Sequence, residues 1–381
     1  MTITSKQPNV GTTIFTVMSQ LAAETGALNL SQGFPNYNCS PKLIELVNHY
    51  MQKGMNQYAP MAGIMPLREI LAQKTADLYN LHYHPNDEIT IVSGCTEAIY
   101  ATMAAILHKG DEVIVFEPAY DSYVPSIELN GGKAVYVTLT AENDFTINWE
   151  VVKSKITERT KAIMLTTPHN PTGKCLTQDD LNKLAEIVRD TNIFIVSDEV
   201  YEHIIFDNRQ HLSPAMHPEL KERTFLCGSF GKTFHTTGWK LGYCLAPKEL
   251  TAEFRKTHQW ITFASPTPMQ YAFADFMKDP NNYLSVRAFY EEKRNKFINW
   301  LKGSRFTWKP AEGSFFQMVS YNQITDESDY DLAVRWTKEI GVASIPISVF
   351  YNERYDNKIL RFCFAKDDET LEKAAERLCK L

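Results

Sequence analysis

The apolar positions of this chain follow two alternating periods. Short apolar runs, typical of buried strands, lie at 89–92, 112–116, 134–138, 162–166, 193–197, 224–227 and 242–246. Several are separated by amphipathic segments, such as 179–189 and the stretch in which Ile99, Met103, Ile106 and Leu107 share one helical face. Buried strands that alternate with helices predict an α/β fold, with a mostly parallel seven-stranded sheet between helices.

The pattern changes after residue 275. A long charged helix is predicted at 289–301, a strand around Gly313–Phe316, a helix at 331–340 and a strand at 359–365. This is an α+β arrangement. We therefore expect a large domain over 45–275 and a smaller C-terminal domain over 276–381, joined by an N-terminal arm over 1–44 that contributes to the small domain.

Composition and charge narrow the class of protein. The chain has 381 residues, 44% of them hydrophobic, with a net charge of −6 and a mean hydropathy of −0.29. A general nucleic-acid or anionic-membrane surface is disfavoured. The first ten residues lack a signal-peptide pattern, and no apolar run is long enough for a membrane span. Seven scattered cysteines without C-x-x-C spacing indicate a reduced, cytoplasmic protein with no metal site.

Polar side chains gather just after three predicted strands. Asn170 follows the strand at 162–166, Asp198 and Tyr201 follow the strand at 193–197, and Ser229 and Lys232 follow the strand at 224–227. The carboxyl ends of parallel strands meet at one edge of a sheet, where ligands bind. The set, completed by Lys240, suits a ring with a basic nitrogen, a phenolic oxygen and a phosphate, which describes pyridoxal phosphate (PLP).

The order N-P, D-E-V-Y, S-x-x-K and a second cation eight residues later resembles the fold-type I PLP-dependent aminotransferases. The fragments LSQGFPNY, NQYAPMAG, EPAYDSY, TPHNPTGK, SDEVYEHI, GKTFHTTGWK and RFCFAK are most similar to the subgroup of methionine aminotransferase, kynurenine aminotransferase and glutamine transaminase K. The resemblance extends from about residue 11 to the C-terminus. It implies ping-pong transamination in a homodimer.

The resemblance also implies roles for individual residues. Lys232 would form the Schiff base and carry the proton from the substrate Cα, Asp198 would pair with the pyridine nitrogen, and Tyr201 and Asn170 would bond the phenolic oxygen. The remaining cofactor ligands would be Gly94, Cys95, Thr96, Tyr120, Ser229, Lys240 and, from across the dimer interface, Tyr58. Tyr123 is a neighbour of lower rank. Lys240 stands where the commoner pattern has Arg, and a phosphate accepts a single ammonium well.

The predicted substrate-binding residues are an arginine near the C-terminus and several aromatic residues. Arg361, between apolar neighbours, would bind the α-carboxylate with its planar fork, together with Asn170 and the backbone N–H of Gly33. Phe15, Phe263 and Phe315 would line the pocket. Aromatic walls without a second arginine favour a large apolar, thioether or aromatic side chain. Methionine is the first choice, with phenylalanine, histidine, glutamine and kynurenine left open.

Other classes of function can also be tested against the sequence motifs. The P-loop pattern fails because Leu226 stands where glycine is required, and no G-x-G-x-x-G follows a strand. His82 and His84 have no metal-ligand spacing. A PLP-dependent transcription regulator would need a DNA-binding extension, for which we expect no room before Gly11. A cysteine-S-conjugate β-lyase would use the same residues, so the motifs leave that alternative open.

Overall fold

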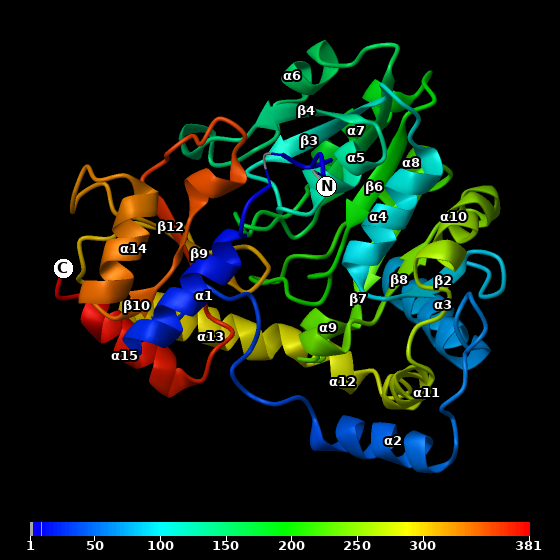
Figure 1. The fold of residues 1–381 in the computed structure, drawn as a ribbon, viewed down its shortest axis with the longest axis horizontal. Coiled ribbons are helices and arrows are strands. Elements are labelled where there is room, and N and C mark those ends of the chain that lie inside the picture. The colour runs from blue at the N-terminus through cyan, green and yellow to red at the C-terminus, as the bar shows by residue number, and fades with distance from the viewer. Residues whose placement is uncertain (1–2, 9) are drawn as a thin grey trace.

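The computed structural model describes residues 3–8 and 10–381 and has two parts (Figure 1). A seven-stranded sheet with its helices forms the larger part, and two small sheets with their helices form the other. The N-terminal helix α1, in blue, lies beside the orange and red C-terminal elements (Figure 1). The residues from α1 to about residue 30 and the C-terminal elements therefore meet in the smaller part.

The large sheet has the strand order β2-β8-β7-β6-β5-β3-β4. Only β8 runs antiparallel to its neighbours β2 and β7, whereas the other neighbouring pairs are parallel. The strands are β2 (Ile89–Val92), β3 (Glu112–Glu117), β4 (Lys133–Thr138), β5 (Thr160–Thr166), β6 (Phe194–Asp198), β7 (Thr224–Ser229) and β8 (Gly242–Leu245). All seven coincide with predicted strands to within a few residues.

Alternating side chains of the central strands fill two separate cores. Ala162 and Met164 of β5 belong to a core with helix α4, whereas Ile163 and Leu165 belong to a core with helix α7. Successive strand residues point to opposite faces, so continuous apolar runs such as 162–165 are buried on both sides. The helices of the larger part are α2 (Pro41–Gln52), α3 (Met65–Tyr79), α4 (Cys95–Ile106), α5 (Tyr123–Leu129), α6 (Trp149–Ser154), α7 (Gln178–Val188), α8 (Pro218–Lys221), α9 (Phe230–Thr233), α10 (Lys248–Ile261) and α11 (Thr267–Phe276).

The smaller part holds an antiparallel sheet of order β11-β12-β9 and a two-stranded parallel sheet of β1 and β10. Its strands are β1 (Leu28–Asn29), β9 (Phe316–Ser320), β10 (Val342–Ala343), β11 (Ile345–Pro346) and β12 (Ile359–Cys363). Its helices are α1 (Ile14–Thr25), α12 (Asn281–Leu284), α13 (Val286–Trp300), α14 (Asp329–Glu339) and α15 (Asp368–Leu378). Four 3₁₀ turns complete the described elements at Ala141–Asn143, Pro214–Met216, Thr237–Trp239 and Ile347–Phe350.

Two details refine the expectations from sequence. Lys232 does not lie on an exposed connection between strands, because Phe230–Thr233 form the one-turn helix α9 and the lysine is half-buried. The Asn170–Pro171 peptide, which the sequence left open, is cis. Over the described residues, no helix is both long and apolar enough to cross a membrane. The exact domain limits at 44 and 275 stay a prediction.

Candidate active site

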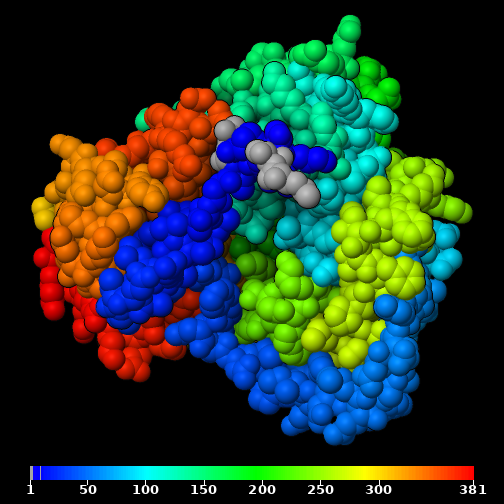
Figure 2. Space-filling model, in the orientation of Figure 1, coloured from blue at the N-terminus to red at the C-terminus, as the bar shows by residue number. Residues whose placement is uncertain are grey.

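A cavity of about 320 Å³ lies where the carboxyl ends of the central strands face the smaller part. On the face drawn in Figure 2, the surface is hollowed between the blue N-terminal segment and the green segment near α9. Most of the predicted site residues line this cavity: Phe15, Gly33, Gly94, Cys95, Thr96, Tyr120, Asn170, Asp198, Tyr201, Ser229, Lys232, Lys240 and Arg361. The topology therefore brings together residues that are more than 300 positions apart in sequence.

The amine of Lys232 is enclosed by other cations and aromatic rings. Its Nζ donates to the carbonyl oxygen of Gly33 at 2.9 Å and lies 5.1 Å from the ring centre of Phe315 and 5.7 Å from that of Tyr201. Burial lowers the pKa of this amine to about 8, and the positive charges of Arg361 and Lys240 act in the same direction. A substantial fraction of the amine is therefore neutral near physiological pH, as a nucleophile or base must be.

Asp198 is a buried carboxylate at the end of β6. It accepts hydrogen bonds from the Tyr123 hydroxyl at 2.7 Å, from the thiol of Cys95 at 3.5 Å and from the backbone N–H of Val200 at 3.3 Å. Burial raises the pKa of Asp198 to about 6, against the lowering effect of the Tyr123 hydrogen bond. No Lys or Arg of the described residues forms an ion pair with it. A protonated ring nitrogen in the cavity would supply the missing positive partner.

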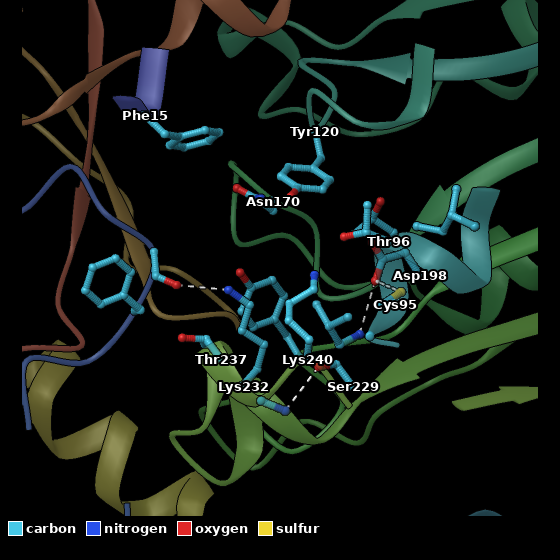
Figure 3. A pocket seen from close by; sticks show the side chains of 18 of the residues that line it. Phe15, Cys95, Thr96, Tyr120, Asn170, Asp198, Ser229, Lys232, Thr237 and Lys240 are labelled. Atoms are coloured by element: carbon cyan, nitrogen blue, oxygen red, sulfur yellow. Dashed lines mark hydrogen bonds between the residues drawn. The ribbon is translucent and has the colours of Figure 1, made fainter. Parts of the chain in front are cut away.

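A group of anion-binding features lies at the start of helix α4. Gly94 is the N-cap with φ +79°, and Cys95 and Thr96 begin the helix, whose free N–H groups favour a negative charge. The Lys240 ammonium lies directly above this turn, because a Cβ on Gly94 would come within 3.2 Å of its Nζ. Ser229 lies on the same side of the cavity (Figure 3). This donor set suits a phosphate.

Arg361 projects from β12 into the opposite half of the cavity. It is fully buried and stacks on Phe316, with 3.8 Å between the guanidinium carbon and the ring centre. Its Nη1 donates to Asn170 Oδ1 at 2.9 Å and its Nη2 to the Ser31 carbonyl at 3.1 Å, while Nε has no partner among the described residues. No carboxylate pairs with this guanidinium in the described chain. A buried cation without an acid is a site prepared for an anion.

The aromatic walls differ from the expectation in one position. Phe15 lines the cavity, with its ring centre 5.3 Å from the Arg361 guanidinium carbon. Phe316, and not Phe315, forms the neighbouring wall. The pairing of β9 with β12 explains the difference. Met318 of β9 lies directly opposite Arg361 of β12, and Phe316, two residues before Met318 on β9, therefore points to the same face of the sheet as Arg361. Phe315 is fully buried behind the wall, where its ring contacts that of Tyr201.

Two further predicted residues lie outside the cavity of their own chain. Tyr58 is 85% exposed, and its ring packs edge-on against Phe263, which is 42% exposed, with 5.5 Å between ring centres. Trp260, the penultimate residue of α10, is 82% exposed. The single chain therefore does not bring Tyr58 or Phe263 to the site. Tyr58, Trp260 and Phe263 are therefore exposed aromatic residues of the single chain.

The cavity also has lining residues that sequence reasoning did not single out: Gln32, Phe34, Ile99, Thr166, Val200, Gly231, Thr237, Leu241 and Phe316. The positions of several of these residues in the sequence indicate that they lie near the site. Gln32 and Phe34 flank the predicted Gly33, and Thr166 is the last residue of β5. Tyr123, ranked low from sequence, lines the cavity and holds Asp198. Over the described residues, no cluster of three His, Cys, Asp or Glu side chains suits a metal ion.

Comparisons with known proteins identify the class to which this site belongs. The family model for aminotransferase class I and II matches residues 25–378. The chain belongs to this family and is an aminotransferase. The site described above accordingly lies in a protein whose reaction is the transfer of an amino group.

Particular relatives share the whole length of the chain. It is 45% identical to the methionine aminotransferase of Escherichia coli over 378 residues, covering 99% of this chain and 98% of the relative. It is 33% identical to kynurenine–oxoglutarate transaminase of Dictyostelium discoideum, covering 99% and 96%. Among solved structures, an Escherichia coli protein with a methionine aminotransferase function superimposes with a TM-score of 0.98 at 44% identity, covering 100% of both chains. These relatives bear out the predicted fold, class and subgroup, and they give the β-lyase alternative no support.

Proposed function

We propose that the protein is a PLP-dependent aminotransferase that acts on methionine and other amino acids with large apolar or aromatic side chains. The residues present fit the cofactor. The α4 N-terminus with Ser229 and Lys240 would hold its phosphate, Asp198 its ring nitrogen, and Asn170 and Tyr201 its phenolic oxygen, with Tyr120 against the ring. When bound, PLP supplies an aldehyde for the amino group and a ring that withdraws electrons from the substrate Cα.

The proton transfer falls to Lys232. Its amine, whose pKa is lowered to about 8 by burial, would be available as a base that takes the proton from the substrate Cα and delivers it to C4′ of the cofactor. The aromatic rings of Tyr201 and Phe315 exclude water on one side of the amine. Asp198, as an anion, would stabilise positive charge at the ring nitrogen throughout the reaction.

The proposed substrate class depends mainly on Arg361, whose fully buried guanidinium has no carboxylate partner among the described residues. Its fork would bind the α-carboxylate, with Asn170 and the N–H of Gly33 beside it. Arg361 is the one arginine that lines the cavity in the described chain, so no second fork awaits a side-chain carboxylate. The side chain would instead meet Phe15, Phe34 and Phe316. These walls, and the similarity to a methionine aminotransferase, favour a thioether or aromatic side chain over aspartate.

We further propose a cytoplasmic homodimer. The exposed aromatic pair of Tyr58 and Phe263, whose rings pack edge-on, supports such an interface. Docking a second copy against it would carry Tyr58 toward the partner's phosphate site and Phe263 toward the partner's substrate. Seven free cysteines, five of them buried, support a reducing compartment.

The test is a half-reaction followed by absorbance. Purified protein saturated with PLP is mixed with one amino acid at a time, without any 2-oxo acid, and the loss of the aldehyde-form absorbance is recorded. We expect methionine to react fastest, phenylalanine and histidine to follow, and aspartate to react slowly. Lys232→Ala should show no conversion. Absence of protein-bound cofactor absorbance after PLP addition and removal of unbound PLP would overturn the site assignment. Aspartate as the fastest donor would overturn the substrate class.

A further inference from the structure

Five consecutive backbone carbonyls, of residues 30–34, are each held by a donor, and the last three of these residues line the cavity. The carbonyl of Leu30 accepts from the N–H of Cys363 at 2.8 Å. The carbonyl of Ser31 accepts from Arg361, and that of Gly33 from Lys232 at 2.9 Å. The two remaining carbonyls, of Gln32 and Phe34, both accept from Nζ of Lys366, at 3.4 and 2.6 Å.

Lys366 itself does not line the cavity. It follows β12, is only 3% exposed, and lies with its ammonium 5.0 Å from the ring centre of Phe34. No carboxylate of the described residues pairs with it, so its charge is balanced by the two carbonyl oxygens and the aromatic ring alone. A buried ammonium is costly unless it is bonded. The two carbonyl oxygens of Gln32 and Phe34 therefore keep the Lys366 ammonium at this position.

The two bonds to Lys366 fix the direction of the Gln32–Gly33 peptide. In a trans peptide the C=O and the N–H point in opposite directions. With the carbonyl of Gln32 turned toward Lys366, the N–H of Gly33 points the other way. This N–H has no acceptor among the described residues, and Gly33 lines the cavity. A side chain at Gly33 would clash, since a Cβ there would lie 2.9 Å from Phe316 Cζ.

We infer that Lys366 is a positioning residue that sets the Gly33 N–H as a donor toward the substrate carboxylate beside Arg361. The inference rests on the proposed function, because it assumes that an α-carboxylate binds in this half of the cavity. Lys366 acts through the backbone and touches no reacting atom. It also holds Phe34, so the same bonds set the aromatic wall next to the carboxylate site.

The chain provides a matched control. Lys358, at the other end of β12, also donates to two backbone carbonyls, of Asp326 and Glu327, at 3.0 and 3.1 Å. It lies outside the cavity. Lys366→Met and Lys358→Met thus each remove an ammonium that donates to two backbone carbonyls, one beside the proposed carboxylate site and one away from it. Lys358→Met also removes an ion pair with Asp356, at 2.9 Å.

The experiment compares these two variants and Lys366→Arg as PLP-loaded proteins. The readouts are KM and kcat for methionine, Kd for 4-(methylthio)butanoate, which has the carboxylate but no amine, Kd for PLP, and Tm. For Lys366→Met we expect KM and the carboxylate Kd to rise about tenfold, about 1.4 kcal/mol, with smaller changes in kcat and in PLP affinity. Lys366→Arg, which keeps a cationic donor, should recover most of the loss. Lys358→Met should lower Tm without changing either constant.

Equal kinetics for Lys366→Met and Lys358→Met at equal loss of Tm would overturn the inference and leave Lys366 a structural residue. If Lys366→Met does not fold, Lys366→Gln serves in its place, because its side chain is one atom shorter and still polar. Failure of the proposed function is recognised separately: the wild-type protein would then neither bind the carboxylate nor convert methionine.

Discussion

The hydroxyl of Tyr123 joins Asp198 to the end of the neighbouring strand. It donates to Asp198 Oδ2 at 2.7 Å and lies 2.6 Å from the hydroxyl of Thr166. A tyrosine has one hydroxyl proton, so Thr166 is the donor in the second contact. Asp198 is thus held by a two-hydroxyl relay that crosses from β6 to β5, beneath the proposed cofactor ring.

Removal of that hydroxyl should weaken cofactor binding in a pH-dependent way. In Tyr123→Phe, Asp198 loses the hydrogen bond that opposes the effect of burial, so its pKa should rise above its value of about 6. We expect the Kd for PLP at pH 7 to increase roughly tenfold, the effect of a hydrogen bond to a charged group. The defect should shrink as pH rises and Asp198 ionises.

Tyr351→Phe is the control for that experiment. Its buried hydroxyl donates to the carbonyl of Leu139 at 2.7 Å, away from the cavity. An equal loss of PLP affinity in both variants, or a defect that does not vary with pH, would contradict a specific role of Tyr123 in holding the charge of Asp198.

Asp198 should destabilise the cofactor-free protein at neutral pH. Its pKa is raised from 3.8 to about 6 in the folded chain, so the folded state keeps a proton that the unfolded state has lost. Stability contributed by the protonated form is therefore lost as pH rises from about 4 through 6. We expect Asp198→Asn to raise the free energy of unfolding of the cofactor-free protein by about 1–3 kcal/mol at pH 7.5, with no gain at pH 4, and to abolish transamination.

Chemical denaturation of the cofactor-free proteins at the two pH values measures this difference. A lower stability of Asp198→Asn at pH 7.5 would show that the ionised carboxylate is satisfied by its three donors. The gain in stability with loss of activity would instead be the expected trade-off at a site built for a ligand.

Arg361→Lys tests the importance of the planar fork. A single ammonium cannot keep the bonds to both Asn170 and Ser31 and also bind a carboxylate with two parallel contacts. We expect KM for methionine to rise about 10–100-fold, as for the loss of one charge-assisted hydrogen bond, while kcat changes less. Steady-state kinetics over a range of methionine concentrations measures both. Arg335→Lys, at a partly exposed ion pair with Glu327 on α14, should behave as wild type.

The proposed exchange of Tyr58 between protomers predicts a complementation. Lys232→Ala and Tyr58→Phe homodimers should each have low activity. A heterodimer of the two would contain one site with an intact lysine from one protomer and an intact tyrosine from the other. Random subunit exchange in an equal mixture makes half of the dimers heterodimers, each with one intact site of two. We therefore expect mixing to restore activity toward about a quarter of that of the wild type, measured by methionine turnover. Activity that stays at the average of the two homodimers would place Tyr58 in its own protomer's function.

The sequence predicts the sheet well because its signals are local. The runs at 89–92 and 162–166 are apolar on both faces, and polar residues follow each strand, so the carboxyl-end cluster of Asn170, Asp198 and Lys232 follows from topology alone. The choice between Phe315 and Phe316 was not predictable, because it depends on the register of β9 against β12. Lys366 was missed for a similar reason: its partners are carbonyls more than 330 residues away, and a backbone acceptor leaves no trace in side-chain identity.

Glu202 is another residue whose surroundings cannot be predicted from the sequence. Its carboxylate pairs with Lys74 and accepts from the Tyr79 hydroxyl at 2.8 Å, within one core beneath the Asp198–Tyr201 segment. The motif D-E-V-Y-E indicates a conspicuous pair of acids beside the site residues, but only the fold shows that Asp198 and Tyr201 face the cavity while Glu202 faces away from it.

The five held carbonyls at 30–34 have a consequence for the order in which the protein is made. The residues of this chain that line the phosphate side all precede residue 241, whereas four of the five carbonyls at 30–34 gain their donors only with Arg361, Cys363 and Lys366; the carbonyl of Gly33 has its donor, Lys232, earlier. At roughly 5–20 residues per second, several seconds separate the synthesis of Lys240 from that of the residues that anchor the substrate half. The residues that would hold PLP are therefore made before those that would select an amino acid.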